Sequence, residues 1–162
     1  VKHLKFNLDK YQIAPHLITW EISEYLIGEN PQEVGIILPQ LKQLGIQLQL
    51  DNFGRVASIY GRVRPNLLYK EFERVKIDRH LISLIERDQQ AWDVFKKILL
   101  DLKKQGFSMT ITGIENLSQL KKVNEIAGDY GQGNLLSQPL NSSEATNLMS
   151  SNQAMFDKSN LN

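Results

Sequence analysis

Four polar residues of the sequence are spaced so that they could act together: Glu21, Asp51, Lys76 and Thr112. Each lies at or near the carboxyl end of a short segment in which apolar and polar residues alternate. Two carboxylates beside a cation suggest a metal site for phosphate chemistry, where the ion activates water. The alternative is a lysine that forms a Schiff base with a carbonyl substrate.

The alternating segments that carry these residues are predicted to be strands. Residues 46–51 place Ile and Leu on one face and Gln and Asp on the other. The same parity recurs at residues 17–23, 74–78 and 107–112, and a weaker strand is expected at 129–132. Because helical stretches separate the strands, we predict parallel pairing and an α/β sheet or barrel.

The polar faces of these strands have two interpretations. In a (β/α) barrel the face opposite the helices points inward, and functional groups gather at the carboxyl ends of the strands. Alternatively, the polar residues face solvent on a sheet that is covered on one side. Ordinary parallel strands are apolar on both faces, so inward carboxylates and a lysine favour a cavity with a function.

Helix boundaries follow from proline and glycine. A helix is predicted to begin at Pro31, after Asn30, and to end just before Gly45. Pro39 should kink or split this helix because proline removes a backbone donor. A second helix is expected to end at Gly106, before another strand.

The end of the chain differs in composition from the rest. A closing helix is predicted over residues 142–149, followed by a segment rich in Ser, Asn and Gln. We therefore assign residues 1–150 to one domain and residues 151–162 to a flexible tail.

Composition excludes several classes of function. Of the 162 residues, 41% are hydrophobic and 23% charged, and the net charge of +1 forms no basic stripe, so no nucleic-acid polymer is expected as partner. Without cysteine there can be no disulfide, thiolate zinc site or cysteine nucleophile. No apolar run reaches the roughly 18 residues that span a bilayer. We expect a cytoplasmic piece of a longer protein, with no membrane contact from this segment.

Other conspicuous residues have simpler explanations. Trp20 lies on the apolar face of its strand and is predicted to be in the core. The three histidines, His3, His16 and His80, lack metal-ligand spacing, so surface or capping positions are expected for them.

Five segments carry a resemblance, in the same order as in a known family. Residues 18–24 (Ile-Thr-Trp-Glu-Ile-Ser-Glu) look like Leu-Glu-(Ile/Leu)-Thr-Glu, 50–54 (Leu-Asp-Asn-Phe-Gly) like Leu-Asp-Asp-Phe-Gly, and 75–79 (Val-Lys-Ile-Asp-Arg) like Leu-Lys-Ile-Asp-Arg. Residues 111–116 (Ile-Thr-Gly-Ile-Glu-Asn) are similar to Ala-Glu-Gly-Val-Glu-Thr, and 129–140 to Asp-Tyr-x-Gln-Gly-x-Leu-(Phe/Leu)-Ser-x-Pro-Leu. The chain thus resembles the EAL family of cyclic-di-GMP phosphodiesterase domains.

The resemblance implies a modified TIM barrel that uses Mg²⁺ or Mn²⁺ to open the cyclic dinucleotide to linear pGpG. It implies that Glu21, Asp51 and Asn52 stand at metal-ligand positions and that Lys76 and Thr112 stand at catalytic positions. The positions of ligand contacts or supporting carboxylates are Gln132, Asp78, Glu24 and Glu115.

Departures from the family pattern fall on the chemistry. Asn52 replaces an aspartate that would bind metal, and Thr112 replaces a glutamate that is a ligand and candidate base. Residues 55–58 replace a loop that couples the family's site to dimerisation. The Glu-Ala-Leu motif and the first strands have no counterpart before Leu17, so about five strands of a partial barrel are expected.

These departures predict a degenerate domain in cyclic-di-GMP signalling that acts by ligand binding or protein contact, with weak affinity for the dinucleotide. The alternative is an active phosphodiesterase whose remaining segment lies elsewhere. Open sheet edges are usually covered, so we expect a homodimer, a larger homo-oligomer or a partner protein over the missing strands.

Overall fold

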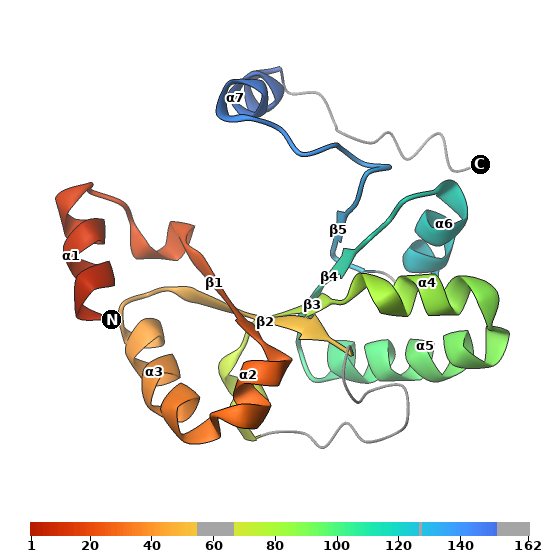
Figure 1. Cartoon of the computed structure of the whole chain (residues 1–162), viewed down its shortest axis with the longest axis horizontal. Helices are drawn as coiled ribbons and strands as arrows, with labels where there is room; N and C mark the ends of the chain where they lie inside the picture. Colours follow the sequence, from red (N-terminus) through yellow and green to blue (C-terminus); the bar gives the residue numbers. More distant parts are fainter. Residues whose placement is uncertain (55–66, 127, 152–162) are drawn as a thin grey trace.

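The structure, a computed structural model, describes residues 1–54, 67–126 and 128–151. Five parallel strands form one sheet in the order β1-β2-β3-β4-β5 (Figure 1). Their bounds are Thr19–Ser23, Gln47–Phe53, Arg74–Ile77, Ser108–Thr112 and Tyr130–Gln132. This confirms the predicted partial barrel of about five parallel strands with flanking helices.

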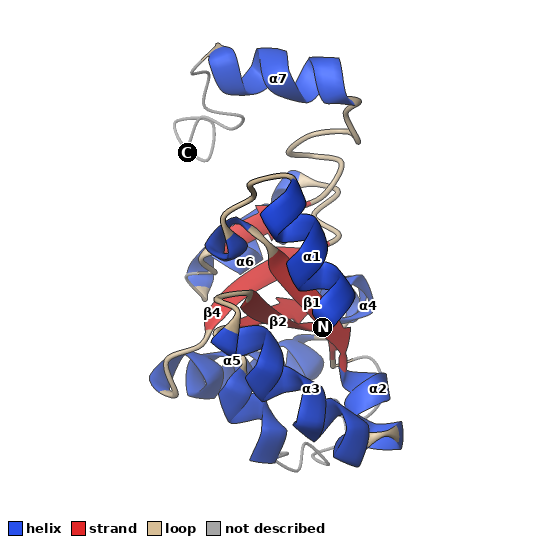
Figure 2. Cartoon of the chain, turned by 90° about the vertical axis from the view of Figure 1, so that its left-hand side faces the viewer, coloured by secondary structure: helices blue, strands red, loops and turns tan. Residues whose placement is uncertain are grey.

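The α-helices alternate with the strands along the chain, although the described part of the segment between β2 and β3 contains only a 3₁₀ turn. They are α1 (Lys2–Lys10), α2 (Glu24–Glu29), α3 (Pro31–Gln43), α4 (Arg79–Arg87), α5 (Gln89–Lys104), α6 (Leu117–Glu125) and α7 (Ser142–Ser150), with 3₁₀ turns η1 (Pro15–Leu17) and η3 (Leu67–Glu71). In both overall views α2, α3 and α5 lie along the same side of the sheet (Figures 1 and 2). Helix α7 stands apart from the sheet and buries no residue.

Alternation along the strands decides which side chains meet the helices. The apolar residues of β2, β3 and β4 are almost fully buried in one core with the inner faces of α3, α4, α5 and α6. The strand residues in this core include Leu48, Leu50, Val75, Ile77, Met109 and Ile111. The predicted alternation, with apolar residues facing the helices, is therefore confirmed, and the opposite face of the sheet carries the polar residues.

The pairing of β2 with β3 is irregular where the site begins. Leu50 pairs with Val75 and Phe53 pairs with Ile77, so β2 contains one more residue than β3 between the two pairs. Asn52 lies in this irregularity with φ of 57°, in the left-handed region that asparagine tolerates better than most residues. A bulge of this kind re-aims side chains at the end of a strand.

Two expectations about the elements need correction. Helix α3 runs through Pro39 without a break, so of the two predicted effects, a kink or a split, the split does not occur. Trp20 is 42% exposed rather than part of the core, although its pairing partner Leu48 is fully buried. The reason is that β1 is an edge strand, and the helices cover its apolar face less completely than that of β2.

Some predictions fall outside the described residues, namely those for the loop at 55–58 and for the tail from 152 to 162. Within the described part, the closing helix ends at Ser150, one residue beyond its predicted end. No helix there combines the length and the apolar character needed to cross a membrane.

Candidate ligand-binding site at the strand ends

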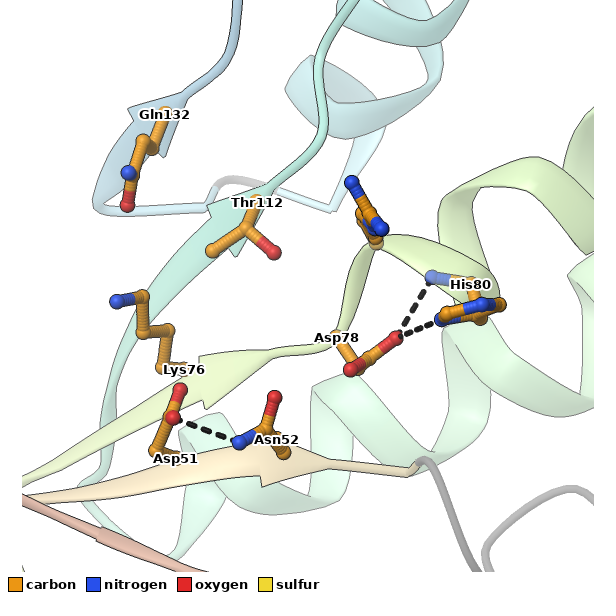
Figure 3. A pocket seen from close by; sticks show the side chains of 8 residues that line it. Asp51, Asn52, Lys76, Asp78, His80, Thr112 and Gln132 are labelled. Carbon is orange, nitrogen blue, oxygen red and sulfur yellow. Dashed lines mark hydrogen bonds and ion pairs between the residues drawn. The ribbon is translucent and has the colours of Figure 1, made fainter. Parts of the chain in front are cut away.

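A pocket of about 350 Å³ opens at the carboxyl ends of the strands (Figure 3). Strands β2, β3, β4 and β5, the start of α4, and the residue between β3 and α4 provide its lining residues. These are Asp51, Asn52, Lys76, Asp78, Arg79, His80, Thr112 and Gln132. Its size falls within the range of small-molecule sites, roughly 300–1,000 Å³.

Lys76 and Glu21 form an ion pair across the polar face of β2. The Lys76 ammonium lies 3.0 and 2.9 Å from the two carboxylate oxygens of Glu21. Gln49 lies between them in the sheet and donates its amide to Glu21 Oε1 at 2.9 Å. The resemblance assigns Glu21 to a metal and Lys76 to catalysis, and in this structure the two side chains pair with each other. An ammonium in an ion pair also gives no support to the Schiff-base alternative.

Asp51 and Asn52 form a second pair at the bulge. The Asn52 amide donates to Asp51 Oδ2 at 2.7 Å, as Figure 3 shows. A second aspartate at position 52 could not make this contact, because an ionised carboxylate has no proton to donate. Asp51 and Asn52 are therefore joined by a hydrogen bond at the wall of the pocket.

Thr112 is tied to the backbone of the neighbouring strand. Its hydroxyl donates to the carbonyl oxygen of Ile77 at 2.7 Å. The side chain therefore links β4 to β3, and its only proton is engaged in this bond. A threonine hydroxyl so held has no means to act as a general base near neutral pH.

The residues present do not fit a divalent metal site. No group of three or more His, Asp or Glu side chains within the described ranges is arranged to hold an ion. Glu21 is already satisfied by Lys76, and Asn52 supplies an amide that points at Asp51. Mg²⁺ and Mn²⁺ require several oxygen ligands held around one point. The side chains of Glu21, Asp51 and Asn52 do not supply such a set in this arrangement.

His80 belongs to the pocket, which the sequence did not indicate. It is exposed, as predicted, but its Nδ1 lies 2.7 Å from Asp78 Oδ1, and its backbone N–H donates to the same oxygen at 2.8 Å. Asp78 itself is only 6% exposed. The signal that could have revealed this is an Asp two residues before a His at a helix start, since Asp often caps the backbone there.

Two of the predicted ligand contacts lie outside the pocket. Glu24 accepts from the Tyr69 hydroxyl at 2.7 Å and from the Gly54 backbone N–H at 3.1 Å, so it ties α2 to the end of β2 and to η3. Burial raises the pKa of Tyr69, and the hydrogen bond to the charged Glu24 raises it further. Glu115 is exposed, and its backbone N–H donates to Gln119. Gln132 does line the pocket, from the edge strand β5.

The sequence pattern of the EAL domain matches residues 1–139. The chain belongs to the EAL domain family. Among curated relatives, the cyclic-di-GMP phosphodiesterase PdeA of Borreliella burgdorferi is 30% identical over 138 residues, covering 84% of this chain and 20% of that protein. The signaling protein YkoW of Bacillus subtilis is 26% identical over 137 residues, covering 85% of this chain and 17% of that protein. This EAL chain thus spans at most about a fifth of these relatives.

Solved EAL domains share the fold. The phosphodiesterase PaMucR, in complex with c-di-GMP, matches with a TM-score of 0.74 and 22% identity over 87% of this chain and 56% of that chain. BlrP1 of Klebsiella pneumoniae, in a manganese and cyclic-di-GMP complex, matches with a TM-score of 0.72 and 20% identity over 85% of this chain and 34% of that chain. The five strands therefore correspond to part of an EAL barrel.

Proposed function

We propose that this EAL domain acts in cyclic-di-GMP signalling without hydrolysing the dinucleotide, through ligand binding or contact with a protein. The observation that carries the proposal is the Glu21–Lys76 ion pair. The resemblance assigns a metal-binding carboxylate and a water- or phosphate-holding lysine to these positions. In this chain the two groups neutralise each other, with Gln49 as a further partner of Glu21.

The two substituted positions support the same conclusion. Asn52 donates one amide hydrogen to Asp51, and Thr112 donates its hydroxyl hydrogen to the Ile77 carbonyl. A positioned general base typically contributes about 10²- to 10⁴-fold to a rate. Loss of a base and of a metal carboxylate together therefore removes most of the catalysis that the family's chemistry relies on.

A retained ligand-binding role is supported by the shape and lining of the pocket. Asp51, Lys76 and Gln132 remain at its wall and offer hydrogen bonds to a phosphate or a guanine. Several structural neighbours are complexes with c-di-GMP, which makes this dinucleotide the ligand to test first. We expect weak binding, because part of the family's contact surface has no counterpart in this chain.

Hydrolysis is tested by incubating the purified chain with c-di-GMP and Mn²⁺ and separating linear from cyclic dinucleotide by chromatography. We expect no linear product above the level given by the Glu21→Gln variant. That variant removes the assigned metal carboxylate, so product formed by both samples comes from a contaminating enzyme. Product formed only by the unaltered chain would overturn the proposal.

A second candidate is an active phosphodiesterase whose site is completed by residues outside this chain. The observation that favours it is the 30% identity to a relative named as a cyclic-di-GMP phosphodiesterase, of which this chain spans 20%. The same assay on the longest natural protein that contains this chain separates the two candidates. Activity there that is lost with Glu21→Gln would support the second one.

The open edge of the sheet supports an association of the domain with a second copy of itself. Within the part of the chain that the structure describes, strand β1 pairs on one side only, and apolar residues beside it are well exposed, including Leu17 at 71% and Trp20 at 42%. Burying such a surface stabilises an assembly. Sedimentation over a range of concentrations should reveal a dimer or larger oligomer, in keeping with a cytoplasmic signalling module. A monomer at every concentration would exclude this part of the proposal.

A further inference from the structure

One end of the pocket is formed by three consecutive residues, Asp78, Arg79 and His80. Asp78 is buried, and its Oδ1 holds the imidazole of His80 by Nδ1 at 2.7 Å. An ionised carboxylate accepts only, so Nδ1 carries the proton and Nε2 is the nitrogen left for a ligand. The His80 side chain is 60% exposed, and a ligand from solvent can therefore reach it.

Arg79 is fixed at its base and open at its tip. The end of β4 lies against it so closely that a Cβ atom on Gly113 would come within 2.4 Å of Arg79 Cβ. Among the described residues, the guanidinium has no ionic or hydrogen-bonding partner. Arginine is suited to bind phosphate because its planar group donates two parallel hydrogen bonds.

The protonation of His80 decides whether the charged groups around the pocket have a net negative charge or none, and this bears on the binding of an anionic ligand. Asp51 and Asp78 carry two negative charges, and Lys76 and Arg79 carry two positive ones. Glu21, which pairs with Lys76 at the rim, adds one more negative charge. The group as a whole is therefore negative when His80 is neutral and balanced when His80 is protonated.

We propose that Arg79 and His80 form the phosphate-binding arm of this pocket, and that His80 binds a phosphodiester as an imidazolium oriented by Asp78. The inference rests on the proposed ligand-binding function and adds residues to which no role in the site was assigned. It requires that affinity for the ligand rise as the pH falls through the range in which histidine gains a proton, between about pH 8 and 5. The charge of a phosphodiester does not change over this range, so the ligand itself contributes no such dependence.

Titration calorimetry of the full chain with c-di-GMP, in buffer containing a chelator, tests the proposal at about pH 5.5 and about pH 8. We expect the dissociation constant to be about tenfold lower at the acidic end, the gain typical of a hydrogen bond to a charged group. His80→Gln should remove this difference and leave the affinity found at alkaline pH. Arg79→Gln should weaken binding at both pH values. His16→Gln, which changes an exposed histidine outside the pocket, is the matched control and should keep the pH dependence.

A second measurement on the unaltered chain does not depend on the folding of any variant. Nuclear magnetic resonance follows the ring protons of His80 as the pH is varied, with and without c-di-GMP. Bound phosphodiester favours the charged ring, so its half-titration point should move to higher pH when the ligand is present. A His80 resonance that responds neither to ligand nor to the Arg79→Gln change would overturn the phosphate-binding arm.

The outcomes separate this inference from the function on which it rests. If c-di-GMP binds and neither pH nor His80→Gln alters its affinity, the proposed function stands and the phosphate-binding arm is excluded. If c-di-GMP does not bind while guanosine monophosphate or inorganic phosphate shifts the His80 titration, the dinucleotide function is excluded and the anion subsite stands. If no probe binds at either pH, both the ligand-binding form of the proposed function and the phosphate-binding arm are excluded.

Discussion

The Lys76 ammonium lies 2.9 Å from Glu21 Oε2, across a strand that separates the two residues in the sheet. Both side chains are partly shielded, with 20% of Lys76 and 41% of Glu21 exposed. A pair in this setting is held by geometry that the sheet imposes.

The strength of this pair can be measured by a double-mutant cycle with Glu21→Gln and Lys76→Met. We expect a coupling energy of about 0.5–1.5 kcal/mol from urea denaturation, because the pair is partly shielded from solvent and is joined by two hydrogen bonds. The exposed pair of Lys5 and Asp9, with 59% and 66% of the side chains accessible, should couple by less than about 0.5 kcal/mol. Additive effects of the Glu21 and Lys76 changes would show that the pair contributes nothing.

Strand alternation allowed much of this site to be predicted. The pattern at residues 46–51 defined a strand and its polar face, and the same parity placed Glu21 and Lys76 on that face. What the sequence could not give is the distance between them, because it depends on how the strands are staggered. The resemblance assigns Glu21 to a metal, and the register of β1, β2 and β3 places its carboxylate within hydrogen-bond distance of Lys76.

Two other features depend on tertiary context in the same way. Trp20 lies on the helix-facing side, as its parity predicted, but its exposure follows from the edge position of β1. The irregular pairing near Asn52 follows from the packing of β2 on β3 and has no local sequence signal. Alternation reports which face a residue takes, and it carries no information about which strand lies at an edge.

The bond between Tyr69 and Glu24 should give the stability a dependence on alkaline pH. The pKa of Tyr69 is raised in the folded chain by burial and by Glu24, so the unfolded chain loses this proton first. The contribution to the free energy of unfolding is therefore present below about pH 10 and decreases as the pH rises above it. Urea denaturation should show Tyr69→Phe to be less stable by about 1 kcal/mol near neutral pH, with a smaller difference at higher pH.

The comparison needs a tyrosine that lacks such a bond. Tyr11 is 62% exposed, and Tyr11→Phe should change the stability little at any pH. A Tyr69→Phe difference that stays constant between neutral and strongly alkaline pH would contradict the assigned role of Glu24.

Asn52→Asp should make the stability of the domain sensitive to metal. The change removes the hydrogen bond to Asp51 and places two carboxylates side by side, so we expect a loss of about 1–2 kcal/mol without metal. A divalent cation bound between them would restore part of the loss by mass action. Thermal unfolding should therefore show Mn²⁺ raising the melting temperature of Asn52→Asp and leaving that of the unaltered chain unchanged. An equal response in the two proteins would contradict the view that Asn52 disables a metal site.

Gly133 is required where β5 leaves the pocket, because its backbone lies against the end of β4. A Cβ atom there would come within 2.1 Å of the Ile114 carbonyl oxygen and 2.4 Å of the Ile114 nitrogen, so the backbone itself would have to move. Gly133→Ala should cost about 2–3 kcal/mol by chemical denaturation, as overpacking does, and should displace the neighbouring Gln132 from the pocket. Gly28→Ala is the matched control, because an added Cβ in α2 meets nothing within 4 Å. That change should leave stability equal or raise it by up to about 1 kcal/mol, and a similar loss in both variants would show that the close approach at Gly133 is not what requires glycine.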